Sequence, residues 1–423
     1  MEEQLLHFIW HRKLYADEEL TTTTGQRVRV IHPGIPNHDQ GPDFLQARVR
    51  IDDQIWAGHV EIHVRSSSWY LHSHERDTHY NTVILHVVWQ EDQPAKTEQG
   101  VIIPCIELCG IVDAVLLERY RHLMNNSEWV PCASSLENVS EIVRASWLDR
   151  LMAERLESKT DYIATILDRC NGDWEQTFFV MLSRHLGSPA NGDAMENLGL
   201  KIPLTILRKH ADRIDQIESI LFGVAGMLTK ELYAPYPSRL KKEFDFQKMK
   251  YGLQVIPSLQ WKFMRMRPTH FPTIRIAQLA VILSKQQAFV QMVAGRATIK
   301  EWINLFRVSP QDEYWQTHYH FRSESPAAGK MLGLDTATSL LINLVGPFMF
   351  FYGKRQGLSQ LKERAIALLS ELPAEKNTII RSWRECGWLA HDAGQTQALL
   401  HLKKKYCDQR RCLHCAVGLQ VLR

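Results

Sequence analysis

The feature that most constrains the fold is a change in hydrophobic periodicity near Val139. Before this point, the chain contains short segments rich in Val and Ile. In these segments apolar residues alternate with polar ones or follow one another without interruption, which is typical of β-strands. After it, apolar residues recur at helical spacing over long segments, which is typical of amphipathic helices. The chain has 423 residues, more than a single hydrophobic core usually contains. The pattern predicts the α+β class, with a mixed-sheet domain at residues 1–135 and a larger all-α domain at residues 136–423.

The N-terminal domain is predicted to begin with a helix at 2–14 and to contain an irregular segment with a short helix at 66–81. The segment at 82–89 is almost continuously apolar, which indicates a central strand that is buried on both faces. Strands are predicted at 27–31, 44–51, 55–64, 82–89 and 100–108. In the C-terminal domain, helical patterns cover 141–167, 173–187, 214–228, 273–293, 339–355 and 357–372.

Composition limits the compartment and the partners of the protein. The net charge is only +3, so an anionic partner would have to bind a local basic patch. No uninterrupted apolar segment reaches the roughly 18 residues that a membrane span needs. The N-terminal sequence MEEQLLHFIWHRKLY also lacks the basic region and cleavage site of a secretory signal. We therefore expect a cytoplasmic protein with no membrane partner, in which the cysteines are reduced thiols or metal ligands.

Two acids and a histidine are predicted to converge in the N-terminal domain. Asp43 directly precedes the strand at 44–51, whereas Glu61 and His63 alternate with apolar residues in the strand at 55–64. Residues two apart on a strand share one face, so pairing of the two strands would bring all three side chains together. Carboxylates suit Mg²⁺ or Mn²⁺, and a nearby histidine is able to accept a proton from water near neutral pH. The alternative is a Gly-Pro-Asp turn beside a solvated strand face.

Histidines near this cluster indicate a second kind of chemistry. His72 and His74 follow in the irregular segment, and His86 lies within the apolar strand. A hydrolase of a small substrate that uses a transition metal would bring His63, His72 or His74 and an acid to one ion. A third reading is a module that binds nucleic acid or protein without catalysis. In that case the acids would lie apart or form ion pairs.

Three cysteines near the C-terminus have the spacing of a metal site. Cys407, Cys412 and Cys415 form a C-x4-C-x2-C pattern, which predicts a structural zinc ion. Tetrahedral zinc needs a fourth ligand. Of the local candidates we favour Cys386, with His401 and His414 as alternatives. The contrasting reading is three reduced cysteines at a helix end.

Two basic segments would suit the phosphate backbone of a nucleic acid. One combines cations with aromatic residues, an arrangement that suits single-stranded or flipped bases; the other is a lysine run beside the cysteines. Both would equally fit a rigid interhelical loop or a solvated face. The candidate contacts are Arg265, Arg267, Arg275, Lys403, Lys404 and Lys405.

The order helix, three strands, short helix, strand, with an acid opening the second strand and Glu-x-basic in the third, resembles the PD-(D/E)xK nuclease superfamily. This resemblance implies a restriction-endonuclease-like mixed sheet and a metal-dependent nuclease in which Asp43 and Glu61 bind Mg²⁺ or Mn²⁺. His63 stands where that superfamily usually has lysine. The similar very-short-patch repair endonucleases also use a histidine there. Some nucleases of the superfamily bind an iron–sulfur cluster through C-terminal cysteines, so this cluster is the alternative to zinc.

A second resemblance covers nearly the whole chain. The segments GPDF, GHVEIHV, SSWYLHSHERDTHYNTVILHVVW, ERLESK, RMRPTHFPTIRIAQLA and YCDQRRCLHC occur in order from end to end. Together they resemble an uncharacterised bacterial family, the domain of unknown function 2851. This resemblance names relatives and implies no particular reaction.

Overall fold

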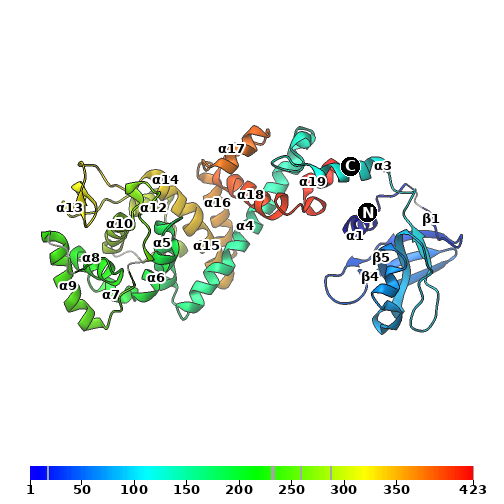
Figure 1. Cartoon of the computed structure of the whole chain (residues 1–423), viewed down its shortest axis with the longest axis horizontal. Coiled ribbons are helices and arrows are strands. Elements are labelled where there is room, and N and C mark those ends of the chain that lie inside the picture. Colours follow the sequence, from blue (N-terminus) through cyan, green and yellow to red (C-terminus); the bar gives the residue numbers. More distant parts are fainter. Residues whose placement is uncertain (17–18, 230–233, 258–259, 286–287, 423) are drawn as a thin grey trace. The chain divides into compact units, whose positions relative to one another are not determined.

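The computed structural model of the chain (Figure 1) describes residues 1–16, 19–229, 234–257, 260–285 and 288–422. It divides into two compact units, which are considered separately. The N-terminal unit comprises Met1–Arg144 together with Lys403–Arg423, and the helical unit comprises Ala145–Leu402. The α+β class is confirmed, because a mixed sheet near the N-terminus precedes a mostly helical region. The C-terminal tail belongs to the N-terminal unit rather than to the helical one.

A seven-stranded mixed sheet forms the centre of the N-terminal unit. Its order is β1-β2-β4-β5-β6-β7, and β3 pairs with β4. The pairs from β1 to β5 are antiparallel, whereas β5–β6 and β6–β7 are parallel. The strands are β1 (Leu20–Thr21), β2 (Arg27–His32), β3 (Ile35–Pro36), β4 (Phe44–Ile51), β5 (Gln54–Arg65), β6 (Val83–Gln90) and β7 (Cys105–Glu107).

Burial along the strands explains why the sequence pattern located them. In β4, Ala47, Val49 and Ile51 are buried between exposed neighbours, as an alternating pattern requires, and the register shifts between buried Phe44 and Ala47. In β6 the run from Leu85 to Val88 is fully buried, as expected for a strand inside a mixed sheet. Four of the five predicted strands match β2, β4, β5 and β6 closely. The fifth was predicted too long, since within 100–108 only the residues of β7 form a strand.

The connection from β5 to β6 consists of α2 (Ser68–Leu71), η1 (His74–Arg76) and η2 (Thr78–Thr82). Trp69 anchors this connection, since it is fully buried and its indole Nε1 donates a hydrogen bond to the Lys96 carbonyl (2.9 Å). It packs in a small core with Tyr80, Val83, Ala95 and Ile103. The histidines of this connection are therefore held by a rigid aromatic support.

Helices at both ends of the chain complete the N-terminal unit. Helix α1 (Glu3–Arg12) packs against β5 (Figure 1) and buries Leu5, Leu6, Ile9 and Trp10. At the other end of the chain, helix α19 of the C-terminal tail packs against α3 (Figure 1). The remaining elements are α3 (Ala114–Asn125), η3 (Ala133–Asn138), η7 (Lys403–Cys407), η8 (Cys412–His414) and α19 (Ala416–Leu422).

The helical unit buries large aromatic side chains between its helices; Phe178, for example, stacks on Phe289 (ring centroids 4.7 Å apart) and meets Phe348 edge-on (5.1 Å). One short hairpin, β8 (His318–His320) with β9 (Ser323–Glu324), interrupts the helices. The helices are α4 (Glu141–Arg169), α5 (Trp174–Gly187), α6 (Gly192–Lys201), α7 (Leu204–Arg208), α8 (Ile214–Val224), α9 (Pro235–Tyr251), η5 (Pro268–His270), α10 (Pro272–Ser284), α11 (Phe289–Ala294), α12 (Ile299–Phe306), α13 (Tyr314–Thr317), α14 (Leu334–Leu340), η6 (Leu341–Val345), α15 (Gly346–Arg355), α16 (Ser359–Glu371), α17 (Thr378–Glu385) and α18 (Ala393–Leu402).

The single helix that we predicted at 273–293 is divided between α10 and α11. Residues 286 and 287, which this prediction also covered, lie outside the described ranges.

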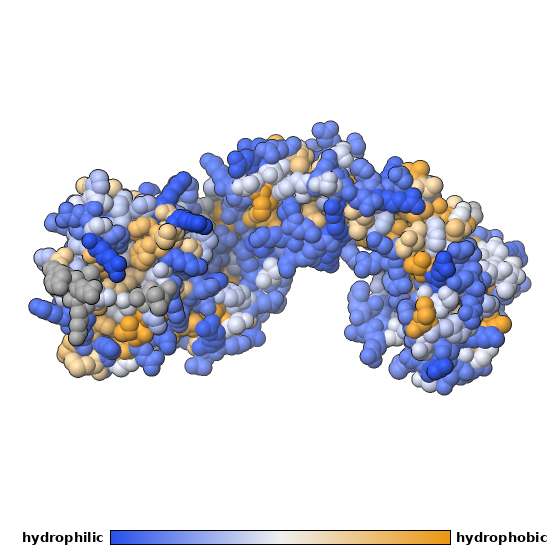
Figure 2. All heavy atoms as spheres, in the orientation of Figure 1, coloured by the Kyte–Doolittle hydropathy of each residue, from blue (hydrophilic) through white to orange (hydrophobic). Residues whose placement is uncertain are grey.

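One helical stretch, Leu334–Arg355, is long and apolar enough to cross a membrane. Of its most apolar 18-residue window, 67% is buried inside the protein. On the face of the molecule seen in Figure 2, hydrophilic residues cover most of the surface and hydrophobic residues are scattered among them. The stretch is therefore part of the helical core.

Candidate metal centre

The structure brings Asp43, Glu61 and His63 together where β4 begins beside β5. Phe44 pairs with Val60 across the two strands, so Asp43 lies next to Glu61. The Asp43 backbone N–H donates to Glu61 Oε2 (3.1 Å), and the Ile62 N–H donates to Asp43 Oδ2 (2.9 Å). These reciprocal bonds fix the two carboxylates side by side. His63, two residues further along β5, lies with its Nε2 3.6 Å from Glu61 Oε1.

His72 and His74, from the connection after β5, join this cluster. His63 Nε2 lies 3.1 Å from His72 Nδ1, and His74 Nε2 lies 3.2 Å from Glu61 Oε1. The three histidines each offer one nitrogen, and these three nitrogens lie within 4.8 Å of one another. Three imidazole nitrogens therefore lie close enough to bind one ion, and the Glu61 carboxylate lies beside two of the three rings, those of His63 and His74.

Buried neighbours orient these histidines. His63 Nδ1 shares a hydrogen bond with Nε2 of His86 (2.8 Å), a fully buried residue that pairs with Glu61 across β5 and β6. Tyr80 stacks on the His74 ring (centroids 3.8 Å apart), and Trp69 meets that ring edge-on (5.3 Å). A partner on the second nitrogen of a metal-binding histidine is the usual way to fix its tautomer and orientation.

Burial sets the charge of the cluster. It raises the pKa of Glu61 to about 9, and the adjacent Asp43 carboxylate adds to this rise. It lowers the pKa of His63 to about 2, with further lowering by His86 and His74, and that of His86 to about 3. The buried imidazoles are consequently neutral at pH 7, the form that binds metal. A cation at this point would also favour the ionised form of Glu61.

The donor set fits a transition-metal ion. His74 Nε2 is buried and has no hydrogen-bond partner among the residues that the structure describes, although Glu61 Oε1 is close by. Imidazole nitrogen with one carboxylate suits Mn²⁺, Fe²⁺ or Zn²⁺, whereas Mg²⁺ prefers an octahedron of oxygens and keeps several waters. The residues present therefore fit the histidine-metal reading better than the two-carboxylate magnesium site.

One side of the cluster is open to solvent. Among the proposed ligands, His72 is exposed while His63 and His74 are buried. Beside them, His7 from α1 places its Nε2 3.4 Å from Asp43 Oδ2, and both side chains remain partly exposed (32% and 25%). Burial lowers the pKa of His7, but the Asp43 carboxylate more than offsets this, and the pKa is raised overall. His7 was not among the predicted site residues, because the helical pattern at 2–14 did not indicate that this side chain would face Asp43.

The predicted cysteine ligands lie in different units. Cys407, Cys412 and Cys415 belong to the tail of the N-terminal unit, where Cys412 and Cys415 are buried. Cys386 directly follows α17 in the helical unit, so its role as fourth ligand remains a prediction.

The basic residues of the loop before α10 differ in exposure. Arg265 and Arg267 are exposed, as a phosphate contact requires. Arg275 is 5% exposed, and its guanidinium donates to Gln278 Oε1 (2.9 Å) inside the helical unit. The prediction that Arg275 contacts nucleic acid is therefore wrong, because the first turns of α10 are buried on all sides.

The three lysines at 403–405 in the tail also differ in their exposure to solvent. Lys403 forms an ion pair with Asp408, and its ammonium lies over the Trp129 ring (5.1 Å). Lys404 and Lys405 are exposed. Only the latter two lysines present their charge to solvent.

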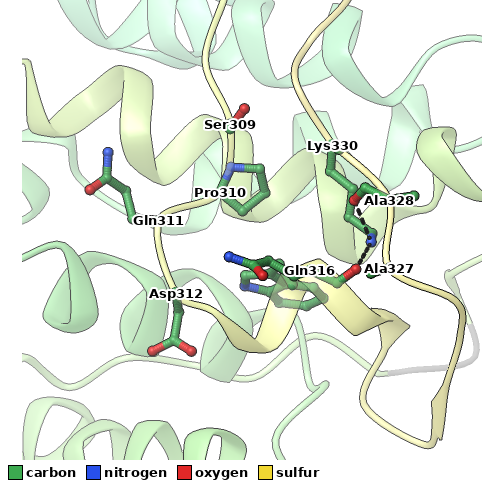
Figure 3. A pocket seen from close by; sticks show the side chains of 10 residues that line it. Ser309, Pro310, Gln311, Asp312, Gln316, Ala327, Ala328 and Lys330 are labelled. Carbon is green, nitrogen blue, oxygen red and sulfur yellow. Dashed lines mark hydrogen bonds between the residues drawn. The ribbon is translucent and has the colours of Figure 1, made fainter.

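A hollow in the helical unit offers little chemistry by comparison. It measures about 460 Å³ and is lined by the segments at 309–316 and 327–330 (Figure 3). Its charged lining residues are Asp312 and Lys330. The Lys330 ammonium points at the backbone (Figure 3) and donates hydrogen bonds to the carbonyls of Gln316 (2.9 Å) and Ala328 (3.1 Å). A lysine held in this way acts as a structural cross-link.

Comparison with known proteins places the chain in a family. No curated protein and no solved structure matches it. Residues 3–378 match the family described as "Protein of unknown function (DUF2851)". The match covers the sheet, the histidine cluster and most of the helical unit, and it ends before the cysteine-rich tail. The chain therefore belongs to the DUF2851 family.

Proposed function

We propose that the N-terminal unit is a metal-dependent hydrolase that cleaves phosphodiester bonds in nucleic acid. His63, His72, His74 and Glu61 would hold a divalent transition-metal ion. The observation that carries the proposal is the gathering of three histidine nitrogens within 4.8 Å of one another, with the Glu61 oxygen 3.2 Å from the His74 nitrogen.

The metal would lower the pKa of a bound water and polarise the phosphoryl group under attack. The residues of the chain have separate tasks around it. Buried His86 would keep His63 in the tautomer whose Nε2 faces the ion, through the 2.8 Å hydrogen bond between the two rings. His7 and Asp43, at the open side, would exchange a proton with the substrate. The exposed edge at His72 would let the substrate approach while the other ligands stay shielded from water.

The order of the strands supports a phosphodiester as the substrate. Strands β2, β4 and β5 form an antiparallel series, and β6 then adds in parallel to β5 after a helical connection. Asp43 opens β4 and Glu61 lies within β5. This order agrees with what the sequence resemblance to PD-(D/E)xK nucleases implies, and the agreement supports the proposal. The exposed Lys404 and Lys405 of the same unit would add favourable charge toward a phosphate backbone.

A hydrolase of a small substrate is the second candidate. It is favoured by one observation, the three imidazole ligands, because nitrogen-rich sites are typical of transition-metal hydrolases in general. A module without catalysis is the third reading. The buried and mutually oriented donors give it less support than either hydrolase.

The test is cleavage of a panel of DNA and RNA by the full chain with Mn²⁺, Zn²⁺, Fe²⁺ or Mg²⁺. We expect cleavage with at least one transition metal and little with Mg²⁺. Glu61→Ala and His74→Ala should abolish it and should also remove metal binding measured by calorimetry. His79→Ala is the matched control, because His79 lies in the same connection and is exposed, and its side chain pairs with Asp77 alone among the residues that the structure describes.

Each result of this experiment has a definite meaning. Cleavage that needs Mg²⁺ and survives His74→Ala would contradict the histidine centre. Metal binding that is lost in His74→Ala, without cleavage of any nucleic acid, would favour the small-substrate hydrolase. Binding of nucleic acid with steep salt dependence but without metal binding would favour the non-catalytic module.

A further inference from the structure

We propose that the exposed side of strands β2, β4 and β5 binds the phosphate backbone of a nucleic acid and positions it at the metal centre. The cations of this surface, which we call the arginine face, are Arg27 and Arg29 of β2 and Arg48 and Arg50 of β4. The inference rests on the proposed function for the identity of the substrate, and it names the surface that would hold that substrate. Its test requires no cleavage.

Alternation along the two strands directs the four arginines to one side of the sheet. All four are exposed, and the valine between the two arginines of each strand is buried. Residues two apart on a strand point to the same side. Arg29 of β2 pairs directly with Arg50 of β4, and directly paired residues of neighbouring strands also share a side. The two pairs of arginines therefore form one continuous positive surface.

This surface has no acid to balance its charge. Like charges that lie directly opposite each other, as Arg29 and Arg50 do, destabilise a sheet. Strands β2 and β4 and the exposed half of β5 contain no Asp or Glu. Asp52, in the turn after β4, accepts the backbone N–H of Arg27 (3.0 Å). Within the described part of the chain, none of the four guanidinium groups forms an ion pair with a carboxylate. A bound polyanion would relieve this repulsion.

The arginine face continues into the side of the sheet that carries the metal centre. Arg50 pairs with Ile55 of β5, and Arg48 pairs with Ala57. Where the register of β5 shifts against its neighbours, the extra residue belongs to β4 or to β6, so β5 itself alternates without interruption. Ile55 and Ala57 therefore lie on the same side of β5 as Glu61. One side of the sheet thus carries both the exposed cations and the proposed ligands.

The two sides of the sheet are covered by different elements. Phe44 pairs with Val60, and its ring meets His7 of α1 edge-on (centroids 5.8 Å apart), so α1 covers the side opposite the arginines. On the metal side, the connection after β5 packs on the second half of this strand, where His74 approaches Glu61. The first four residues of β5 are exposed. A long anion would therefore reach the metal centre from the end at which the arginines lie.

The chemistry and spacing of the arginine face suit a phosphate backbone. A guanidinium remains charged at neutral pH and is able to donate two parallel hydrogen bonds to one phosphate. Successive arginines on one side of a strand are about 6.6 Å apart, and neighbouring strands are about 4.8 Å apart. The charges are consequently spread over a surface, which fits a repeated anion better than a single phosphate. Since the whole chain has a net charge of only +3, this cluster is a local feature.

The experiment measures binding of a fluorescent DNA duplex to the full chain by anisotropy, at several salt concentrations and with a chelator that prevents metal-dependent cleavage. The double variant Arg29→Gln/Arg50→Gln should bind at least about tenfold more weakly at about 0.1 M salt. The slope of log affinity against log salt should decrease in magnitude by about 1.8, because each phosphate contact contributes about 0.9. With single-stranded RNA the expected decrease is about 1.4.

Two further variants show whether the position of the charges matters. The matched control Arg119→Gln/Arg121→Gln removes two exposed arginines from α3 of the same unit, and it should leave affinity and slope nearly unchanged. Arg29→Lys/Arg50→Lys keeps both charges and should retain the slope of the unsubstituted chain. Because Arg29 and Arg50 repel each other, Arg29→Gln/Arg50→Gln should unfold at the same temperature as the unsubstituted chain or at a higher one.

Weaker binding and a smaller slope in Arg29→Gln/Arg50→Gln alone would support the arginine face. Equal effects of this variant and the α3 control, or no binding of DNA or RNA by the unsubstituted chain, would overturn it. Binding to phosphatidylserine vesicles but not to nucleic acid would also overturn it. An active nuclease whose binding does not depend on Arg29 and Arg50 would keep the proposed function and refute the arginine face. An inactive chain whose binding does depend on them would do the reverse.

Discussion

Each unit of the protein buries a cluster of polar side chains, and the two clusters are satisfied in opposite ways. In the helical unit, the Lys159 ammonium donates to Asn343 Oδ1 (3.0 Å) and Gln397 Oε1 (3.0 Å), and the Gln397 amide donates to the Glu375 carboxylate (2.5 Å). Donors meet acceptors throughout this network. In the N-terminal unit, three histidines and Glu61 instead direct their ligand atoms at one another.

This difference indicates which cluster has a function beyond stability. A network of matched donors and acceptors is complete without any further group. In the histidine cluster, by contrast, buried His74 Nε2 has no hydrogen-bond partner among the described residues, and the Glu61 carboxyl has a pKa raised to about 9; a bound cation would satisfy both groups. Since an unpaired buried polar atom costs roughly 1–3 kcal/mol, such an arrangement needs a compensating ligand. We therefore expect metal to act on one unit and not on the other.

The largest expected effect is the response of the two units to metal. At a metal concentration about 100 times the dissociation constant, binding should stabilise the N-terminal unit by about 2.7 kcal/mol. Amide hydrogen exchange in peptides from β5 and β6 should then slow by roughly 100-fold. Peptides from α4 and α18, which carry Lys159 and Gln397, should exchange at the same rate with and without metal. Equal slowing in both units would remove the distinction between the clusters.

A second prediction concerns His86. Among the proposed metal ligands, its hydrogen-bond partner is His63. His86→Phe keeps the volume of the side chain but removes the partner of His63 Nδ1, so metal affinity should fall by about 10–100-fold. Calorimetric titration measures this change. Tyr80→Phe is the control, since it keeps the ring that stacks on His74 and should leave the affinity nearly unchanged. Unchanged affinity in His86→Phe would show that His63 is oriented by other means.

The pH dependence of the metal-free N-terminal unit provides a third prediction. Burial lowers the pKa of His63 to about 2 and that of His86 to about 3. Below pH 6.5 the unfolded chain therefore binds more protons than the folded chain. As the pH is lowered from 6.5, each histidine reduces the free energy of unfolding by about 1.4 kcal/mol per pH unit. Glu61 acts in the opposite direction, because its raised pKa costs stability as pH rises from about 4.5 toward 9.

The sum of these contributions is a stability maximum near pH 6.5 for the metal-free unit. Hydrogen exchange in β5 and β6 after treatment with a chelator, recorded from pH 5 to 9, measures it. In Glu61→Gln the decline above pH 6.5 should disappear. A profile that rises steadily from pH 5 to 9 would contradict the assigned burial of the cluster.

The smallest expected effect comes from the helical cluster. Lys159→Met removes the ammonium whose pKa burial lowers to about 7, and it leaves Asn343 and Gln397 without this donor. Gln397 Oε1 would keep its hydrogen bond from Arg155 Nε (3.1 Å), so the change should cost the helical unit roughly 1–3 kcal/mol of stability through the unpaired Asn343 Oδ1. Metal affinity should stay within twofold of the unsubstituted chain. A large loss of affinity would mean that the two clusters are coupled.

The sequence located the parts of the site whose geometry is local. Strand periodicity placed Glu61 and His63 on one face, and a turn of ordinary length brought Asp43 beside them. His72 and His74 were recognised as potential ligands for the same reason, because they follow β5 directly. His7 was missed because its position depends on tertiary packing, namely on α1 packing against β5.

The most direct test of the central claim is anomalous X-ray scattering at the zinc edge from crystals of the full chain grown with Zn²⁺. We predict a peak at the histidine cluster, bonded at about 2.0–2.2 Å to His63 Nε2, His72 Nδ1, His74 Nε2 and Glu61 Oε1. No peak should occur at Lys159 and Gln397. A peak coordinated by Asp43 and Glu61 oxygens without any histidine, or no peak at this cluster, would contradict the account.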